Sequence, residues 1–133
     1  MDRLSAWAPR VLSILRIVTA LLFVEHGTIK LFAFPMAQEG VPNPLPPLLI
    51  TAAVLELVGG SLVTLGLLTR PVAFLLSGEM AYGYWTVHAP SGPWPAVNMG
   101  EGAILFCFIF LYLVFAGPGP WSVDALIRKG RTP

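Results

Sequence analysis

The chain has 133 residues, of which 56% are hydrophobic and only 11% are charged, and its mean hydropathy is +0.75. Soluble domains hold about 25% charged residues, so this composition excludes an ordinary water-soluble domain. The net charge of +1 and the lack of a basic cluster argue against nucleic acid as a partner. The single cysteine, Cys107, excludes an internal disulfide and a thiolate metal cluster, and we interpret it as a small packing residue.

Four apolar segments follow one another along the chain. A hydrocarbon layer about 30 Å thick needs roughly 20 residues per helix, so four spans would use almost the whole sequence. The first segment is too long for a secretory signal peptide, carries charges and lacks a clear cleavage site. Proline-rich stretches separate the first span from the second and the third from the fourth, because proline removes a backbone donor and interrupts helices. We predict an all-α integral membrane four-helix bundle, a single domain of residues 1–133 with spans at about 11–34, 48–68, 72–88 and 98–116, loops at 35–47 and 89–97, and a short basic tail at 121–133.

The distribution of basic residues predicts the orientation. Lysine and arginine are enriched on the cytoplasmic side of membrane proteins. One side of the predicted bundle is expected to carry most of the basic residues, namely Arg3, Arg10, Arg70, Arg128, Lys129 and Arg131. On the other side only Lys30 borders a predicted span. Both termini should therefore be cytoplasmic, and the two proline-rich loops should face outward.

Each predicted span contains one glutamate: Glu25, Glu56, Glu79 and Glu101. An ionised carboxylate at mid-depth costs roughly 2.5 to 3.5 kcal/mol on insertion scales, so these residues either meet partners and do chemistry or form interhelical hydrogen bonds that hold the bundle together. Both interpretations stay open. Arg16 lies about 8 Å inside the cytoplasmic end, and we interpret it as an anchor that snorkels to the interface.

Further polar residues are expected near the outer side. The helical rise puts His26 about 22 Å and His88 about 25 Å above the inner ends of their helices, and Glu101 about 5 Å from the outer end. On the second span, Ala52, Glu56, Gly60 and Thr64 form a stripe of small residues that should be buried against another helix. The candidate ligand-binding and proton-transfer residues are His26, Lys30, Glu56, His88, Asn98 and Glu101, with Glu25, Glu79 and Tyr84 as secondary candidates.

Such a pocket suits a lipophilic molecule with one polar end, such as a quinone, whose reduction requires proton donors. No electron carrier is visible in the sequence, so turnover would require a partner subunit to supply electrons. Haem ligation by the two histidines is a disfavoured alternative. Motifs for phosphate loops, zinc sites and Ser/His/Asp hydrolysis are missing, so we expect no metal and no covalent cofactor, and no catalytic residue is identified.

Several fragments together resemble the DoxX family: Leu15-Arg16-Ile17, His26-Gly27 with Lys30-Leu31-Phe32, Leu55-Glu56-Leu57 with Gly59-Gly60, Leu65 to Arg70, Thr86-Val87-His88, Asn98 with Glu101, and Gly117-Pro118-Gly119. The resemblance implies a multi-pass protein of the bacterial inner membrane, related to a subunit of thiosulfate:quinone oxidoreductase. It also implies recurrent polar positions at Arg16, His26, Lys30, Glu56, Arg70, His88, Asn98 and Glu101. Glu25 and Glu79 fall outside this pattern.

The leading hypothesis is a quinone-interacting subunit of a membrane oxidoreductase complex, and whether the chain is itself an enzyme stays open. The alternative is a non-catalytic membrane scaffold or assembly factor, whose buried charges pair with each other or with a partner's helix. A sterol- or isoprenoid-modifying enzyme and an ion transporter are weaker alternatives. Expected partners are membrane lipids, an oxidoreductase subunit and, through the Gly60 face, a second copy of the chain.

Overall fold

The computed structural model describes residues 2–131, and these contain helices and no strands, which confirms the all-α prediction. Met1, Thr132 and Pro133 of the predicted domain lie outside the described residues. The long helices coincide closely with the four predicted spans. The elements are a 3₁₀ turn at Ser5–Trp7, α1 (Ala8–Phe32), α2 (Pro47–Val54), the π-helical turn η2 (Leu55–Gly59), α3 (Gly60–Leu65), α4 (Thr69–Gly83), the π-helical turn η3 (Tyr84–His88), the 3₁₀ turn η4 (Ala89–Ser91), α5 (Pro95–Asn98), α6 (Glu101–Ala116) and α7 (Val123–Lys129).

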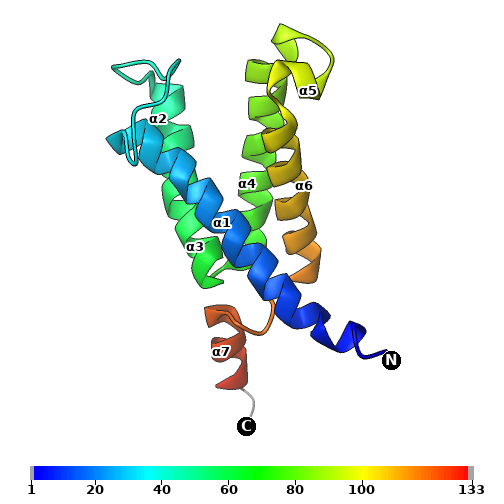
Figure 1. Ribbon diagram of the computed structural model, residues 1–133. Coiled ribbons are helices and arrows are strands. Elements are labelled where there is room, and N and C mark those ends of the chain that lie inside the picture. The colour runs from blue at the N-terminus through cyan, green and yellow to red at the C-terminus, as the bar shows by residue number, and fades with distance from the viewer. Residues whose placement is uncertain (1, 132–133) are drawn as a thin grey trace.

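The helices form two packed groups. Helix α1 crosses the helix made of α2, η2 and α3, and α4 lies beside α6 (Figure 1). Both termini lie at one end of the molecule, together with α7, whereas the loop after α1 and the short helix α5 lie at the other. We call the end that holds both termini and α7 the terminal end, and the end that holds the loop after α1 and α5 the loop end.

Glycines allow α1 to approach the second helix closely. A Cβ added at Gly27 of α1 would lie 2.8 Å from the backbone nitrogen of Leu57 and 2.9 Å from the carbonyl oxygen of Ala53. A Cβ at Gly60 would lie 2.7 Å from Cγ2 of Val24. Small residues let helix backbones come together in membranes. Of the predicted stripe, Glu56 and Gly60 are buried as expected, whereas Ala52 and Thr64 are only partly buried.

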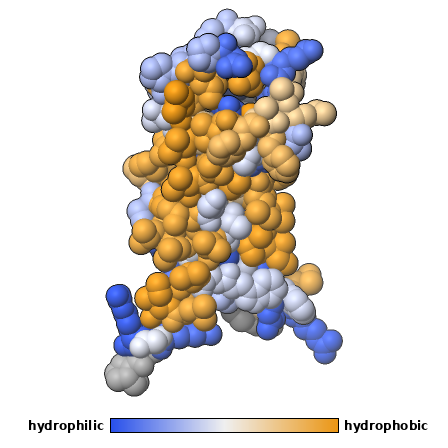
Figure 2. All heavy atoms as spheres, turned by 90° about the vertical axis from the view of Figure 1, so that its left-hand side faces the viewer, coloured by the Kyte–Doolittle hydropathy of each residue, from blue (hydrophilic) through white to orange (hydrophobic). Residues whose placement is uncertain are grey.

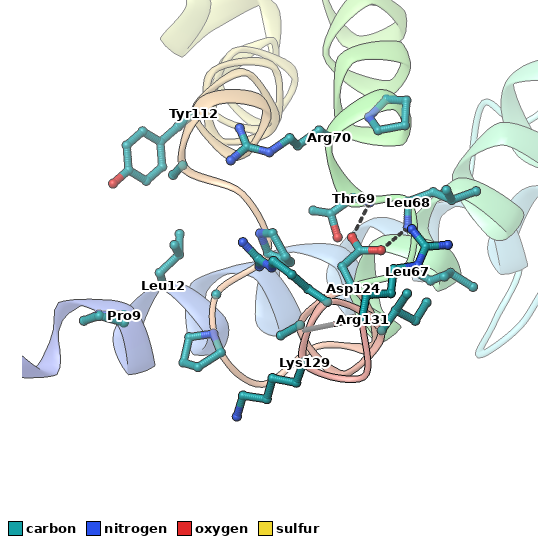
Figure 3. Close-up of a pocket in the computed structure, with 18 of the residues that line it drawn as sticks. Pro9, Leu12, Leu67, Leu68, Thr69, Arg70, Tyr112, Asp124, Lys129 and Arg131 are labelled. Carbon is teal, nitrogen blue, oxygen red and sulfur yellow. Dashed lines mark hydrogen bonds between the residues drawn. The ribbon is translucent and has the colours of Figure 1, made fainter. Parts of the chain in front are cut away.

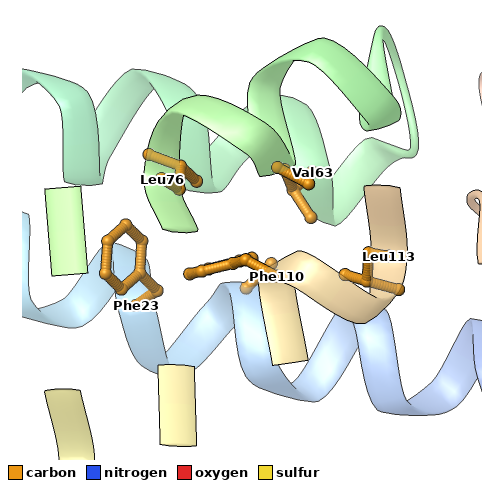
Figure 4. Packing of buried hydrophobic residues seen from close by; sticks show 7 residues of the cluster. Phe23, Val63, Leu76, Phe110 and Leu113 are labelled. Atoms are coloured by element: carbon orange, nitrogen blue, oxygen red, sulfur yellow. The ribbon is translucent and has the colours of Figure 1, made fainter. Parts of the chain in front are cut away.

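The hydrophobic core joins the two groups of helices. Phe23 of α1, Val63 of α3, Leu76 of α4, and Phe110 and Leu113 of α6 are almost fully buried and pack together (Figure 4). The rings of Phe23 and Phe110 meet edge to face, with centroids 4.9 Å apart. Aromatic pairs in this geometry contribute about 0.5 to 1.5 kcal/mol beyond the area that they bury.

Exposed apolar side chains cover the middle of the molecule. Figure 2 shows hydrophobic residues around the waist and hydrophilic residues gathered at the two ends. On α1 the exposed face includes Val18, Leu21 and Leu22, and α6 exposes Leu105 and Phe108. Two helical segments, Ser5–Phe32 and Pro47–Leu65, are long and apolar enough to cross a membrane, and Glu101–Ala116 is apolar but shorter.

Arg16 differs from its sequence interpretation. Its side chain is fully buried instead of snorkelling to the interface. Its guanidinium donates hydrogen bonds to the backbone carbonyls of Val63, Thr64, Pro118 and Trp121. The Val63 carbonyl also accepts from the backbone nitrogen of Gly66 at 3.0 Å. Because Arg16 bonds to the end of α3 and to the segment between α6 and α7, it joins three segments from inside the protein.

Two segments expected to be irregular contain helix. The predicted basic tail forms α7, because Ser122 caps the helix by accepting a hydrogen bond from the backbone nitrogen of Ala125 at 3.2 Å, with Asp124 in the first turn and Arg128 in the last. The predicted loop at 89–97 contains η4 and α5, and the latter begins at Pro95. Proline fits the first helical position because no amide is needed there.

Candidate functional site

Two of the predicted residues form an ion pair between α1 and η2. Lys30 lies in the last turn of α1 and donates to Oε1 of Glu56, whose side chain is only 3% exposed. Burying a carboxylate costs free energy unless it is paired, so the ion pair with Lys30 offsets part of the cost of burying Glu56. The pairing is incomplete, because Oε2 of Glu56 is buried and accepts no hydrogen bond.

A third ionisable side chain, Glu79 of α4, completes this group. Both of its carboxyl oxygens are buried and accept no hydrogen bond, and it interacts electrostatically with Glu56 and Lys30. Two carboxyl groups and one ammonium group therefore lie together between α1, η2 and α4. We call Lys30, Glu56 and Glu79 the buried acid group. If both carboxyl groups were ionised, one negative charge would be left unbalanced, so the group is suited to hold a proton or to meet a donor from a bound molecule.

A second set of candidates forms a network at the loop end. His88 Nδ1 lies 3.1 Å from the carbonyl oxygen of Asn98, and the His88 ring stacks on Tyr84 with centroids 6.4 Å apart. The buried amide of Asn98 donates to the carbonyl oxygen of Gly92 at 2.9 Å and accepts from the Gly100 backbone nitrogen at 2.8 Å. Asn98 thus satisfies backbone groups of the segment between η4 and α6, and this network orders the connection from η3 to α6.

The remaining candidates are exposed. His26 Nδ1 lies 2.8 Å from the carbonyl oxygen of Leu22, and its ring meets Phe106 edge to face at 5.6 Å. Glu101 occupies the first turn of α6, where the helix dipole favours a negative charge. Glu25 is exposed on α1. Hydrogen bonds and an ion pair join Lys30 to Glu56, and join Tyr84 and His88 to Asn98. His26, Glu25 and Glu101 belong to neither set.

Local helix geometry distinguishes three of these residues. Glu56 lies in the π-helical turn η2, and Tyr84 and His88 lie in the π-helical turn η3. Single π-helical turns within α-helices occur frequently at functional sites because they displace side chains from the regular helical positions. Apolar periodicity alone does not reveal such turns in the sequence.

Sequence reasoning missed Asp124. Its two carboxylate oxygens accept hydrogen bonds at 2.9 Å from the backbone nitrogens of Leu68 and Thr69, at the start of α4 (Figure 3). Burial opposes ionisation of Asp124, but these backbone hydrogen bonds outweigh it and lower its pKa below the ordinary value. The signal available in the sequence was Ser122 followed by Asp124, which is typical of a helix start.

Among residues 2–131, no group of three or more His, Cys, Asp and Glu side chains is arranged to hold a metal ion. Nδ1 of His26 and Nδ1 of His88 each face a backbone carbonyl, and the two carbonyls belong to different segments. The buried acid group brings ionisable side chains from three helical segments together.

Comparison with known proteins gives a family and several relatives. The family model described as DoxX matches residues 11–89, which confirms the predicted resemblance. An uncharacterized protein of Haemophilus influenzae is 44% identical over 128 residues, which cover 93% of this chain and 96% of that protein. The inner membrane proteins YqjF and YphA of Escherichia coli are each 30% identical over 127 residues, covering 86% and 87% of this chain and 89% of each relative. No solved structure matches the chain.

Proposed function

The chain belongs to the DoxX family and is a small membrane protein, and on this basis we propose that it crosses the bacterial inner membrane four times with both termini in the cytoplasm. The apolar waist supports the membrane placement, since a bilayer requires a continuous apolar surface. The shared position of the termini supports the orientation. The terminal end also carries Arg70, Arg128 and Arg131, as the positive-inside rule expects of a cytoplasmic side.

We further propose that the protein is a quinone-interacting subunit of a membrane oxidoreductase complex. The observation that carries this proposal is the buried acid group, in which three carboxyl oxygens of Glu56 and Glu79 lack hydrogen-bond donors within an otherwise apolar region. Intramembrane ionisable residues of this kind mark ligand and proton pathways in membrane proteins.

A quinone headgroup would use these side chains in a defined way. Reduction to the quinol adds two electrons and two protons to the two carbonyl oxygens of the headgroup. The Lys30 ammonium and a protonated Glu79 can each donate a hydrogen bond to such an oxygen and then transfer a proton to it. The two electrons come from a partner subunit that carries a redox cofactor, since the chain has no electron carrier of its own.

The test is the quinone content of the protein purified from native membranes in mild detergent. We expect the wild-type chain to retain quinone in stoichiometric amount and Glu79→Gln to lose most of it, because glutamine keeps the shape but transfers no proton and carries no charge. Glu39→Gln, in the exposed loop between α1 and α2, is the matched control. Equal quinone in wild type and Glu79→Gln, or none in either, refutes the assignment.

A non-catalytic scaffold is the second candidate, and a specific observation favours it. The ion pair between Lys30 and Glu56 is made by two residues of the same chain and links the end of α1 to η2, which is a structural role that requires no ligand. A scaffold predicts that substitutions in the buried acid group alter co-purification of partner proteins in proportion to stability. If the chain is a quinone-interacting subunit, Glu79→Gln should still assemble with its partner proteins but lose its quinone.

A further inference from the structure

The terminal end contains a cavity of about 1140 Å³ that the proposed quinone chemistry does not involve. Its walls come from the start of α1, the turn between α3 and α4, the end of α6, and α7 (Figure 3). Four cationic side chains line it, and Asp124 is the only acidic residue among its lining residues. The cationic side chains are Arg70, Arg128, Lys129 and Arg131.

Basic side chains outnumber acidic ones among the lining residues of the cavity by four to one. Both carboxylate oxygens of Asp124 accept hydrogen bonds from the start of α4, so its negative charge is used inside the fold, and Arg128 balances it electrostatically. Arg70 donates from Nη1 to the carbonyls of Val114 at 2.6 Å and Phe115 at 2.7 Å. Its Nε and Nη2 donors lie on the other edge of the planar group, in the geometry that recognises phosphate oxygens.

One wall of the same cavity is apolar. Leu12 of α1 and Tyr112 of α6 line it, and in Figure 3 Leu12 points toward the space below Tyr112 and Arg70. Phe108 lies four residues before Tyr112 on α6 and is exposed, so the apolar surface continues from Tyr112 along the same face of this helix. A molecule that fits the whole cavity therefore needs an anionic head and an apolar chain.

We propose that this cavity binds an anionic phospholipid, with the headgroup phosphate between Arg70 and Arg128 and an acyl chain along Leu12 and Tyr112. Basic pockets between helices at the cytoplasmic side of a membrane bind anionic lipid headgroups in this way. A free phosphate ion would use the cationic wall but leave the apolar wall uncovered, so the apolar wall favours the lipid. With the orientation proposed above, the occupant is an anionic phospholipid of the inner leaflet, for which phosphatidylglycerol serves as the probe.

The experiment titrates the full purified chain with mixed micelles and measures lipid bound per chain. We expect one dioleoyl phosphatidylglycerol per chain and much weaker binding of dioleoyl phosphatidylcholine, which has no net charge. One basic side chain near an anionic surface contributes about 1 kcal/mol, so Arg128→Gln should weaken phosphatidylglycerol binding about fivefold. Arg70→Gln should weaken it similarly, although this variant also removes the contacts to the end of α6.

The matched control is Arg10→Gln. Arg10 lies on α1 near the same end but outside the cavity lining, and its guanidinium packs over the ring of Trp7 at 4.9 Å. The proposal is overturned if Arg10→Gln weakens binding as much as Arg128→Gln, because the effect would then be general surface charge. It is also overturned if phosphatidylcholine binds equally well, or if inorganic phosphate displaces the lipid at equal concentration, which would indicate a small-anion site. The thermal unfolding midpoint of each variant without lipid shows that Arg128→Gln is folded.

Discussion

Replacing Arg16 tests whether a buried cation holds the terminal end together. The guanidinium lies 2.7 Å from the carbonyl oxygen of Pro118 through Nε and 2.6 Å from that of Val63 through Nη1, and it also donates to Trp121. These carbonyls belong to α3 and to the segment before α7. No lipid or water reaches the side chain, because its exposed fraction is 0%.

The expected loss follows from the groups left without donors. A buried carbonyl that loses its donor costs about 1 to 3 kcal/mol, and at least two carbonyls should stay buried after Arg16→Met, since this variant has no donor. Removing the guanidinium also removes its own desolvation cost, which offsets part of the loss. We expect Arg16→Met to lower the free energy of unfolding by about 3 to 5 kcal/mol. Arg16→Lys should lose about half of this, because an ammonium cannot reach carbonyls in several directions as a planar guanidinium does.

The assay is unfolding of the detergent-solubilised protein by increasing mole fraction of dodecyl sulfate, followed by circular dichroism. Arg10→Met, on an exposed turn of the same helix, removes the same charge without breaking these bonds. A loss below about 1 kcal/mol for Arg16→Met, or a loss equal to that of Arg10→Met, would refute the reasoning, because the carbonyls would then have found other donors.

Three further substitutions test other contacts by the same unfolding assay. Gly27→Ala should destabilise the protein by about 1 to 3 kcal/mol, because its Cβ meets backbone atoms of the second helix, whereas Gly78→Ala, with nothing within 4 Å, should be neutral. Lys30→Met should cost about 3 to 5 kcal/mol by leaving Glu56 unpaired, and adding Glu56→Leu should recover most of it; a double variant as unstable as the single one would contradict this. Asp124 has a lowered pKa in the fold, so its contribution is present above its unfolded pKa of about 3.9 and is lost as pH falls through the folded value. The stability difference between wild type and Asp124→Asn should therefore be constant near neutral pH and shrink as the pH falls below about 5, and a difference that stays constant in acid would argue against the carboxylate contacts.

Much of the helical layout is predictable because its causes are local. Apolar stretches of span length define the long helices, and the prolines at 35–47 prevent a helix there. Pro47 and Pro95 begin helices because the first helical position needs no amide donor. The close approach of α1 to the second helix was predictable from the stripe around Glu56 and Gly60, since small residues recur there at helical spacing.

The misread residues depend on contacts between segments far apart in the chain. Arg16 lies in the first half of α1, but whether its side chain turns outward or inward depends on the carbonyls of Pro118 and Trp121, about a hundred positions later. Asp124 likewise caps a helix that begins 55 residues earlier. No periodicity in the neighbourhood of either residue contains this information. The helix that carries Arg16 was therefore predictable, whereas the hydrogen-bond partners of Arg16 and Asp124 were not.

The histidines and the buried acid group differ in what their surroundings allow. His26 is exposed, and His88 takes part in the network of the segment between η3 and α6, so Nδ1 of each ring has a backbone carbonyl as its partner. Glu79 has no such role, because neither carboxyl oxygen accepts a hydrogen bond although both are buried. An apolar side chain would be cheaper at this position, unless a proton or a bound molecule stabilises the carboxyl group. Glu79→Leu therefore separates the two candidate functions: a scaffold should gain stability and keep its partners, whereas a quinone subunit should gain stability and lose its quinone.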